Sequence, residues 1–476
     1  MKRFAWVAIA LLPFLGEWLY KFAIDPRPFW IHYYDPETSY FYEGLRMLSG
    51  CSPFNVDNPG TTVQLASAAI ALFTGRSPLS YPRFLPIAHI LGLLMTIAGA
   101  FVLARTLLRD AAPALAIVTL WTWFMAPQVL EYQMIWTAEV FFFGLGAFAL
   151  AAIVSSLGGA AGSSGPSTDA LAGLTIGILI ATKFVFLAWL PALVVAYFVA
   201  RERPVRRSII ATLGALAGFV AVTSVAIPRY PAMLRWLTGL AANAGTYGGG
   251  PRELPRVADV LANYWRAMST SKAWMLWLAI VIVCAILAFK RAPRVRPVIV
   301  FGAAAGALTL LMAMRAPAFR YLFPVALCAM LLMAVAADVL RNVRWLPTAL
   351  LIVAALLFEK AIARDVSDHR NRLEGQRELH DQVAAIVDRI APHGVIVYSF
   401  RFPQPSFALR INATTDAQLA EIAQRYPREG HYSWKHRVVL PTGATKWDVL
   451  VIDETYPAPV GRTVAQVHEF RIVLPP

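Results

Sequence analysis

Cysteine is scarce in this sequence, with three in 476 residues. Cys284 and Cys328 lie inside apolar stretches, and only Cys51 lies in a polar one. A disulfide framework needs paired cysteines, and a cysteine-based metal site needs a cluster of them. Neither is available, so both are excluded as the basis of the fold.

Charged residues are also few, at 15% of the chain against 58% hydrophobic residues and a mean hydropathy of +0.56. These values lie outside the range of soluble globular proteins and within that of polytopic membrane proteins. Basic residues are in excess, with a net charge of +15, but most lie between apolar segments, where they orient a chain and contact anionic membrane lipids. No basic stripe with interleaved aromatic residues is present. The composition predicts an integral membrane protein and excludes a nucleic-acid partner.

Apolar segments that cross, or nearly cross, a hydrocarbon layer of about 30 Å recur through the first three quarters of the chain. We predict about eleven spans, at 4–24, 84–104, 111–127, 138–157, 170–183, 184–200, 208–227, 273–289, 297–313, 321–338 and 345–360. The first lacks a small-residue cleavage site, so we expect an uncleaved helix rather than a signal peptide. Segments 170–183 and 184–200 are short, and we expect two half-length helices that meet at Lys183.

Basic residues in short loops predict the orientation, because they mark the cytoplasmic side. With Lys2 and Arg3 inside, alternate loops place further basic residues inside: Arg105, Arg109, Arg201, Arg203, Arg206, Arg207, Lys290, Arg291, Arg294, Arg296, Arg341 and Arg344. Segment 61–74 is too short to span and would reverse this pattern, so we expect it to lie along the outer surface. The sequence thus predicts a bacterial inner (plasma) membrane protein with a cytoplasmic N-terminus and outer loops at 25–83 and 228–272.

The segment 361–476 differs in kind from the rest. Ser367 to Ile390 is polar with apolar residues at helical spacing, and His393-Gly394 ends it. The stretches VIVYSF, HRVVL, WDVLVID and FRIVL then indicate short strands. We predict a small exported α/β domain at 361–476, following a polytopic α-helical membrane domain at 1–360.

Two acidic residues follow the first apolar segment, in the stretch IHYYDPETSYFYEGLRMLSG at 31–50. Asp35-Pro36-Glu37 is a typical helix start, with Asp as N-cap, Pro at the first helical position and Glu in the first turn. Capping alone explains these residues. A capping carboxylate can also face a cavity, and these two would be held at the outer membrane surface, where a lipid-borne or soluble substrate can reach them.

The helix that these acids begin has the pattern of a helix in the membrane interface. Leu45 and Leu48 lie on its apolar face, and Glu43 lies on its polar face. The turn Asp57-Asn58-Pro59-Gly60 leads into a second surface helix at 61–74 and is equally explained as a plain capping turn.

Glu131 and Glu139 form a second acidic set, in the stretch EYQMIWTAEV. Glu139 lies at the edge of an apolar run, where an unpaired carboxylate is costly, so we expect it to face a polar cavity or a partner. A structural ion pair with Arg83 or Lys183 is the alternative.

Four outward-facing cations are candidates for binding an anion: Lys183, Arg320, Arg252 and Arg256. Lys183 lies at the helix break, Arg320 precedes the tenth span, and the other two lie in the loop 228–272. Each has a simpler explanation, because basic side chains at a membrane surface also reach lipid headgroups.

The order of these motifs resembles that of a known superfamily. An acidic pair follows the first membrane helix, a surface helix ends at Gly50, a turn leads into a second surface helix, and Gly75 to Arg83 opens a span. The chain continues with LAGLTIGILIATKFVFLAWLP and later PAFRYLFPVAL. Over roughly residues 1–340 this is similar to the GT-C superfamily of polyprenyl-phosphate-sugar glycosyltransferases, in the branch of protein O-mannosyltransferases and lipid A aminoarabinose transferases.

The resemblance implies transfer of a sugar from a polyprenyl-phosphate-sugar donor to a hydroxyl or amine of a lipid, glycan or protein acceptor on the outer face of the membrane. The family places two adjacent acids in the first loop, whereas Pro36 separates Asp35 from Glu37 here. Which of the two acts as base therefore stays open.

The chemistry of such a transfer fits the residues. A carboxylate orients and deprotonates the acceptor, and cations stabilise the departing phosphate, which needs no proton at neutral pH. Asp35 and Glu37 could also supply oxygen ligands to Mg²⁺ or Mn²⁺.

Two other functions use similar features. A transporter or flippase for a lipid-linked sugar would also need charges in its membrane domain, but no repeat relates the two halves of this chain. An assembly or sensor protein could act through its exported domain, but so many spans are excessive for an anchor. Glycosyl transfer remains the favoured interpretation.

Overall fold

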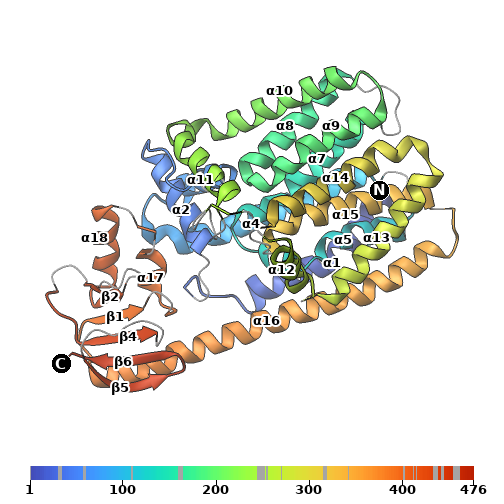
Figure 1. Ribbon diagram of the computed structural model, residues 1–476. Coiled ribbons are helices and arrows are strands. Elements are labelled where there is room, and N and C mark those ends of the chain that lie inside the picture. Colours follow the sequence, from blue (N-terminus) through green and yellow to red (C-terminus); the bar gives the residue numbers. More distant parts are fainter. Residues whose placement is uncertain are drawn as a thin grey trace. The chain divides into compact units, whose positions relative to one another are not determined.

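The computed structural model describes residues 2–30, 35–56, 60–108, 111–158, 165–243, 252–253, 256–269, 271–314, 319–340, 342–399, 402–410, 412–413, 415–432, 438–440, 444–453 and 461–475 (Figure 1). The chain forms two compact units. The first, called the helical unit, comprises Met1–Trp18, Ser49–Ala66 and Ala88–Asp365. The second, called the α/β unit, comprises Leu19–Leu48, Ser67–Ile87 and Val366–Pro476.

The helical unit contains most of the helices, in line with its apolar sequence. Its elements are α1 (Lys2–Leu19), α5 (Pro113–Phe124), α6 (Val129–Gln133), η3 (Ala138–Phe141), α7 (Phe142–Ser156), α8 (Pro166–Thr182), η4 (Phe184–Ala188), α9 (Trp189–Ala200), α10 (Pro204–Thr223), η5 (Ser224–Arg229), α11 (Tyr230–Ala242), α12 (Val257–Ser269), α13 (Lys272–Arg291), η7 (Pro293–Val295), α14 (Arg296–Ala313) and α15 (Phe319–Leu340). Four helices contribute residues to both units: α1, through its last residue Leu19, and α3 (Thr61–Thr74), α4 (Tyr81–Thr106) and α16 (Leu346–Ile390).

Eight helices in the described parts of the chain are long and apolar enough to cross a membrane: Ala5–Ile24, Pro78–Thr106, Ala138–Ser156, Pro204–Ala242, Lys272–Arg291, Pro293–Ala313, Arg320–Leu340 and Leu346–Ile390. Each contains one of the predicted spans or most of it. The other three predicted spans are shorter helices, at Pro113–Phe124, Pro166–Thr182 and Phe184–Ala200. At a rise of about 1.5 Å per residue, a helix of this length falls short of a 30 Å layer. The polytopic helical fold is confirmed, and the predicted break at Lys183 is present: α8 ends at Thr182, and η4 follows Lys183 and leads into α9.

Helices α8 and α10 pack backbone to backbone through four glycines, at Gly173 and Gly177 on α8 and at Gly214 and Gly218 on α10. A Cβ atom built on any of them would overlap a backbone carbonyl oxygen of the opposite helix. Two glycines four residues apart on each helix give the close contact of small residues that is common between membrane helices. Only glycine fits at these four positions.

The α/β unit is built on a six-stranded sheet with the strand order β3-β2-β1-β4-β6-β5. Its strands are β1 (Ile396–Ser399), β2 (Glu429–Tyr432), β3 (Val438–Val439), β4 (Val449–Asp453), β5 (Arg462–Val467) and β6 (Phe470–Leu474). The central strand β1 pairs in parallel with β2 and β4, and the outer pairs are antiparallel. The unit also contains η1 (Tyr20–Ile24), α2 (Asp35–Leu48), η2 (Pro78–Ser80), α17 (Pro405–Arg410) and α18 (Asp416–Arg425).

The helix predicted at 367–390 is confirmed, but it is continuous with the last predicted span. Together they form the 45-residue helix α16, within which the predicted domain boundary falls. This stretch has no proline after its first turn and a single glycine, Gly375, so nothing in it ends a helix. The last turns of α16 place Leu379, Val383 and Val387 against the sheet, in a core shared with Val449 and Ile472.

The four predicted strands are confirmed as β1, β3, β4 and β6, although the first two residues of HRVVL and the last of VIVYSF lie outside the described residues. Two strands were missed. The sequence of β2 is EGHY, which has no β-branched residue, and β5 exposes most of its side chains at the edge of the sheet. Neither shows the apolar alternation by which a strand is recognised.

The first predicted surface helix is α2, and it is more buried than its sequence suggested. Glu43, expected on a polar face, is 5% exposed. The reason is tertiary: a Cβ on Gly44 would lie 2.7 Å from the backbone nitrogen of Ala68, so α2 and α3 touch along their backbones. Of the predicted turn between these helices, Asp57, Asn58 and Pro59 lie outside the described residues.

Candidate active site

The residues predicted to carry the chemistry fall into two groups, one in each unit. Glu131, Glu139, Lys183 and Arg320 belong to the helical unit, whereas Asp35 and Glu37 belong to the α/β unit.

Lys183 lies at the break between α8 and η4. Its φ and ψ of −160° and 130° are those of extended backbone, so the α8 helix ends at Thr182 and the chain turns. The hydroxyl of Thr182 lies 2.9 Å from the carbonyl oxygen of Ile178 and 2.8 Å from the hydroxyl of Thr62. These contacts hold the end of the helix, and Lys183 is thereby directed into the protein, where it is 4% exposed.

Glu139 is the partner of Lys183. It lies in η3, is 4% exposed, and accepts a hydrogen bond from the Lys183 ammonium group. The expectation that Glu139 has a partner is thus met by Lys183 and not by Arg83. Burying one of these charges alone would be costly, and the pair compensates both.

Aromatic rings and a second cation complete this group, which we call the Lys183 cluster: Tyr132, Glu139, Lys183, Arg320 and Tyr321. The Lys183 ammonium nitrogen lies 4.6 Å from the centroid of the Tyr321 ring, and the Arg320 guanidinium carbon lies 5.2 Å from the same centroid. Arg320 also interacts electrostatically with Glu139 and with the hydroxyl of Tyr132. Two positive charges therefore converge near one buried carboxylate.

Tyr132 links the second acidic set to this cluster. It lies on α6 next to Glu131. Its hydroxyl interacts electrostatically with Arg320, Glu139 and Glu131. Burial raises the pKa of Tyr132, while the nearby Arg320 opposes this shift. The hydroxyl is therefore neutral at ordinary pH and can donate a hydrogen bond.

Arg252 and Arg256 are not part of the Lys183 cluster. Both are exposed; Arg252 forms an isolated antiparallel bridge with Asn243, and Arg256 precedes α12. In the described parts of the chain, neither makes a hydrogen bond or ion pair with a member of the cluster. Of the four predicted cations, the structure brings together Lys183 and Arg320.

In the α/β unit, Glu37 is the best-defined of the predicted acids. It is 1% exposed, in the first turn of α2, and its Oε2 atom lies 3.2 Å from an Nη2 donor of Arg27. Asp35 is the first residue of α2, so the helix begins one residue earlier than predicted, and the side chain of Asp35 lies outside the described part of the structure. Arg27 was missed. The available signal was its place in the sequence, because a basic residue in Asp-Pro-Arg-Pro lies only a few residues before the acidic pair.

Tyr81 lies beside this ion pair. It is fully buried, interacts electrostatically with Glu37 and Arg27, and packs its ring 5.2 Å from that of Phe41 and 6.0 Å from that of Phe29. Its hydroxyl has no hydrogen-bond partner among the described residues. No pattern in the sequence singles out this tyrosine among many.

Asp35 and Glu37 are the residues predicted as ligands of a divalent ion, if one is bound. Within the described residues, no group of three or more histidine, cysteine, aspartate or glutamate side chains is arranged to hold a metal ion. Arg27 already engages one oxygen of Glu37. The described side chains therefore fit an ion pair at Glu37 better than a metal ligand set.

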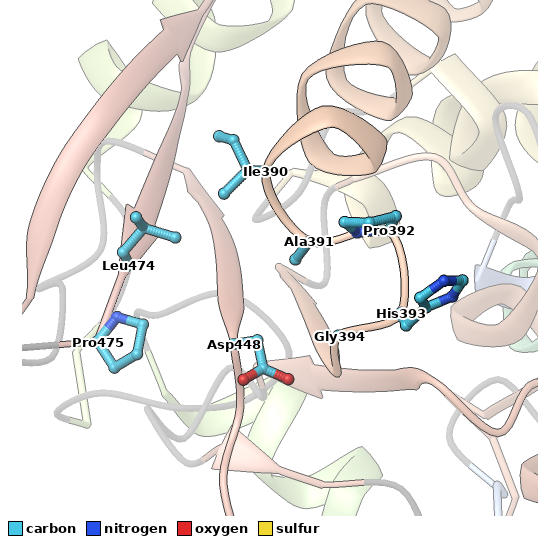
Figure 2. A pocket seen from close by; sticks show the side chains of 8 residues that line it. All are labelled: Ile390, Ala391, Pro392, His393, Gly394, Asp448, Leu474 and Pro475. Atoms are coloured by element: carbon cyan, nitrogen blue, oxygen red, sulfur yellow. The ribbon is translucent and has the colours of Figure 1, made fainter.

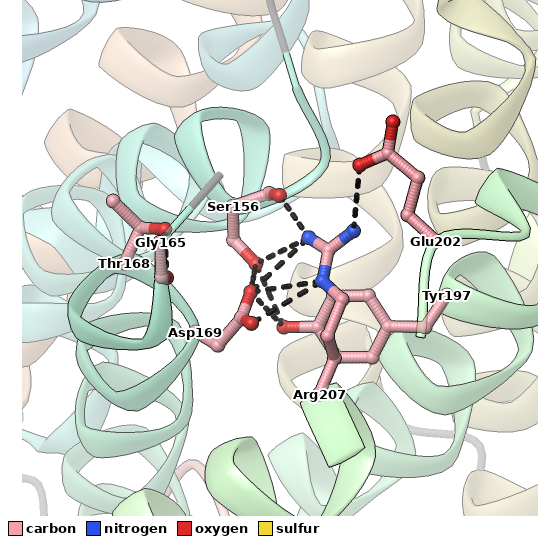
Figure 3. A network of polar contacts seen from close by, with 7 residues as sticks. All are labelled: Ser156, Gly165, Thr168, Asp169, Tyr197, Glu202 and Arg207. Atoms are coloured by element: carbon pink, nitrogen blue, oxygen red, sulfur yellow. Dashed lines mark hydrogen bonds and ion pairs between the residues drawn. The ribbon is translucent and has the colours of Figure 1, made fainter. Parts of the chain in front are cut away.

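A second buried ion pair lies in the helical unit and joins four helices (Figure 3). Arg207 of α10 contacts Asp169 of α8 at 3.1 Å, and its guanidinium lies 4.4 Å over the ring of Tyr197 of α9. The Ser156 hydroxyl of α7 donates to Asp169 at 2.6 Å. Because donors satisfy the carboxylate from three helices, we interpret this network as structural. Arg207, expected in a cytoplasmic loop, lies inside α10 and is buried.

Two pockets are alternative candidates for a site. The first, of ≈ 540 Å³, is shallow and lies where α16 ends and β4 begins (Figure 2). Its carboxylate, Asp448, accepts the Val395 backbone N–H at 2.7 Å and so links the start of β4 to the start of β1. The second, of ≈ 190 Å³, is lined in part by Lys272, Lys360 and Arg364. These cations lie where the apolar stretches of α13 and α16 end, a position typical of lipid-headgroup contact.

The fold and these charged groups define a class: a polytopic helical membrane protein with a small α/β domain and paired charges buried among its helices. Two solved structures of ArnT from Cupriavidus metallidurans share this fold. The one bound to undecaprenyl phosphate is 15% identical, with a TM-score of 0.57 over 98% of this chain and 97% of that chain. The apo form is 16% identical, with a TM-score of 0.58 over 99% and 98%.

At these identities the likeness establishes the fold, and it confirms the fold predicted from the resemblance to GT-C glycosyltransferases. No known protein family matches the sequence. No curated protein matches it either.

Proposed function

We propose that this protein transfers a sugar from a polyprenyl-phosphate-sugar donor to a hydroxyl or amine acceptor at the outer face of a bacterial inner membrane. The observation that carries the proposal is the likeness of fold along 98% of the chain to an ArnT structure bound to undecaprenyl phosphate. That ligand is a polyprenyl lipid with a phosphate group, the part that such a donor would leave behind. The acceptor is a lipid, a glycan or a protein.

We assign the base to the first-loop acids, Asp35 and Glu37. Glu37 is engaged by Arg27, and this ion pair fixes the orientation of its carboxylate. We therefore place Asp35 in the role of base and Glu37 in that of orienting partner.

We assign the leaving phosphate to Arg320, with Lys183 in support. Lys183 is buried against Glu139, whereas Arg320 is partly exposed, and a guanidinium has a planar fork of donors that suits phosphate oxygens. Exposed Arg252 and Arg256 are the second choice for this role. In this proposal Glu139 holds Lys183 in place, and Glu131 acts electrostatically on Tyr132.

The first test is transfer by the purified chain in nanodiscs that contain a polyprenyl-phosphate-sugar. Asp35→Asn should abolish transfer while the unfolding temperature stays near that of the wild type, because losing a cap costs only about 1 kcal/mol. Glu37→Gln also removes a buried charge, so Arg27→Gln serves as its matched control for stability. Full activity in both Asp35→Asn and Glu37→Gln would end the catalytic role of these acids.

A deletion strain tests the donor independently, because loss of the enzyme should let the polyprenyl-phosphate-sugar accumulate in lipid extracts. Translocation of the lipid-linked sugar without transfer would instead support a transporter. Treatment with EDTA, followed by addition of Mg²⁺ or Mn²⁺, decides whether transfer needs a divalent ion.

A further inference from the structure

The helix α2 is held by the C-terminal part of the α/β unit through hydrogen bonds that meet on one of its faces. The Tyr42 hydroxyl donates to the backbone carbonyl of Leu409 in α17. The Asn412 side-chain amide, just beyond α17, donates to the Thr38 hydroxyl at 2.6 Å. We propose that these two contacts position α2, and with it Asp35 and Glu37, for catalysis; this inference rests on the proposed function.

The Tyr42 contact is specific because its hydroxyl donates to a backbone carbonyl that has no hydrogen-bond partner within the short helix α17. The last four carbonyls of any helix lack an intrahelical partner, and Leu409 is the second-last residue of α17. Tyr42 is 5% exposed, so water does not readily replace this bond. Burial raises the pKa of Tyr42, and its hydroxyl stays a donor.

The Thr38 contact lies next to the acid itself. Thr38 follows Glu37 directly and is fully buried. Thr38 and Tyr42 are four residues apart, so they lie on the same face of α2 and about one turn, roughly 5 Å, from each other. One bond would leave the helix free to rotate, whereas two bonds one turn apart fix both its rotation and its position along its axis.

Two further contacts restrain the same region. Gly44 allows α2 to approach the backbone of α3 at Ser67 and Ala68. The hydroxyl of Ser77, before η2, donates to the Glu421 carboxylate on α18. The acidic helix is therefore held on two sides inside one compact unit, and the C-terminal domain supplies one of them.

The experiment removes the two hydrogen bonds without changing side-chain shape. The double variant Thr38→Val with Tyr42→Phe should lower the kcat of transfer by about 10- to 100-fold, because small misplacements of a catalytic group have effects of this size. The KM for the donor should stay within about threefold of the wild-type value, since the substitutions leave the donor-binding cations untouched. Thr38→Ser keeps the hydroxyl, so this single variant should have most of the wild-type rate, in contrast to the single variant Thr38→Val.

Tyr398→Phe is the matched control. It makes the same chemical change in the same domain, at a tyrosine that stacks on Phe402 at 5.0 Å in the sheet, and should leave kcat unchanged. An equal loss of rate in Tyr398→Phe would show a general effect of destabilising the domain and would overturn the proposal.

Amide hydrogen exchange over residues 35–48 of the full chain provides a readout that needs no activity. Protection of α2 should fall in the double variant and not in Tyr398→Phe. Unchanged protection, or lost protection with an unchanged kcat, would overturn the positioning role. If the wild-type chain transfers no sugar at all, the proposed function fails, and the exchange result still decides whether these bonds hold α2.

Discussion

At the scale of single residues, Lys183 shows what the sequence could predict about the site. A lysine within an apolar run must have a partner, and the sequence indicated both the helix break and an ion pair with Glu139 as one of its alternatives. Arg27, Tyr132, Tyr81 and the contact residues of α2 were missed. Their importance comes from tertiary contacts between segments far apart in the chain, and neither periodicity nor spacing signals such contacts.

Arg320 provides the sharpest test of the phosphate site. Two parallel N–H bonds to phosphate oxygens suit the guanidinium and not an ammonium group. Removing a donor to charge that develops in the transition state costs about 3–4 kcal/mol, or two to three orders of magnitude in turnover. We expect Arg320→Ala to lose this much and Arg320→Lys nearly as much, in nanodisc transfer assays with the polyprenyl-phosphate-sugar.

Arg294→Lys is the control for Arg320→Lys. Arg294 pairs with Asp338 at 3.3 Å but is largely exposed, so this substitution should leave turnover unchanged. An Arg320→Lys variant within about threefold of the wild type would remove Arg320 from the phosphate site, because a snorkelling cation tolerates lysine. The role would then pass to Lys183.

Glu429 should make the stability of the α/β unit depend on pH. Burial raises the pKa of Glu429 above its usual value, while a hydrogen bond from Ser406 and the charge of Arg410 oppose the shift. The folded form then holds its proton more tightly than the unfolded form, so this group's contribution to stability is lost as pH rises through the raised pKa.

We expect Glu429→Gln to raise the unfolding temperature relative to wild type at pH 7. The gain should vanish at a pH below the ordinary carboxylate pKa, and scanning fluorimetry of the full chain across this range measures it.

At the scale of elements, the contact between α8 and α10 depends on glycine. Gly177→Leu would force the two backbones apart, and we expect a loss of roughly 3 kcal/mol or more in the free energy of unfolding. Thermal unfolding of the chain in nanodiscs measures the change as a lower midpoint.

Gly375 is the matched control for Gly177, because it also lies within a helix, but a Cβ atom added to it would meet no other atom within 4 Å. Gly375→Ala should be neutral or stabilise the chain by up to about 1 kcal/mol. A similar loss of stability in both variants would contradict the packing explanation.

Elements were predicted well where one pattern repeated for long enough. The eight long apolar helices and the four apolar strands followed from hydrophobicity, while β2 and β5 did not, because pairing with neighbouring strands defines them rather than their own residues. The burial of α2 was missed for the same reason. Its amphipathic pattern suggested one open face, and α3 and α17 cover it.

At the scale of the whole molecule, composition was enough to place the chain among polytopic membrane proteins, and the order of short motifs was enough to predict the ArnT-like fold. Orientation still rests on the basic residues of short loops. The structure allows a sharper test of this orientation, because it shows which cysteines and which other positions are accessible. Cys284 and Cys328 are buried, and Cys51 is exposed, so Cys51→Ser gives a background that should react weakly with a membrane-impermeant thiol reagent.

Two single cysteines introduced into that background report on the two predicted sides of the membrane. Arg294 lies in the loop between α13 and α14, expected in the cytoplasm, and Ala417 is exposed on α18 in the domain expected outside. In intact cells with a permeable outer membrane, Ala417→Cys should be labelled and Arg294→Cys should not, and both should be labelled after the inner membrane is opened. Labelling of Arg294→Cys alone in intact cells would reverse the orientation. The first-loop acids would then face the cytoplasm, and transfer of a sugar at the outer face would be untenable.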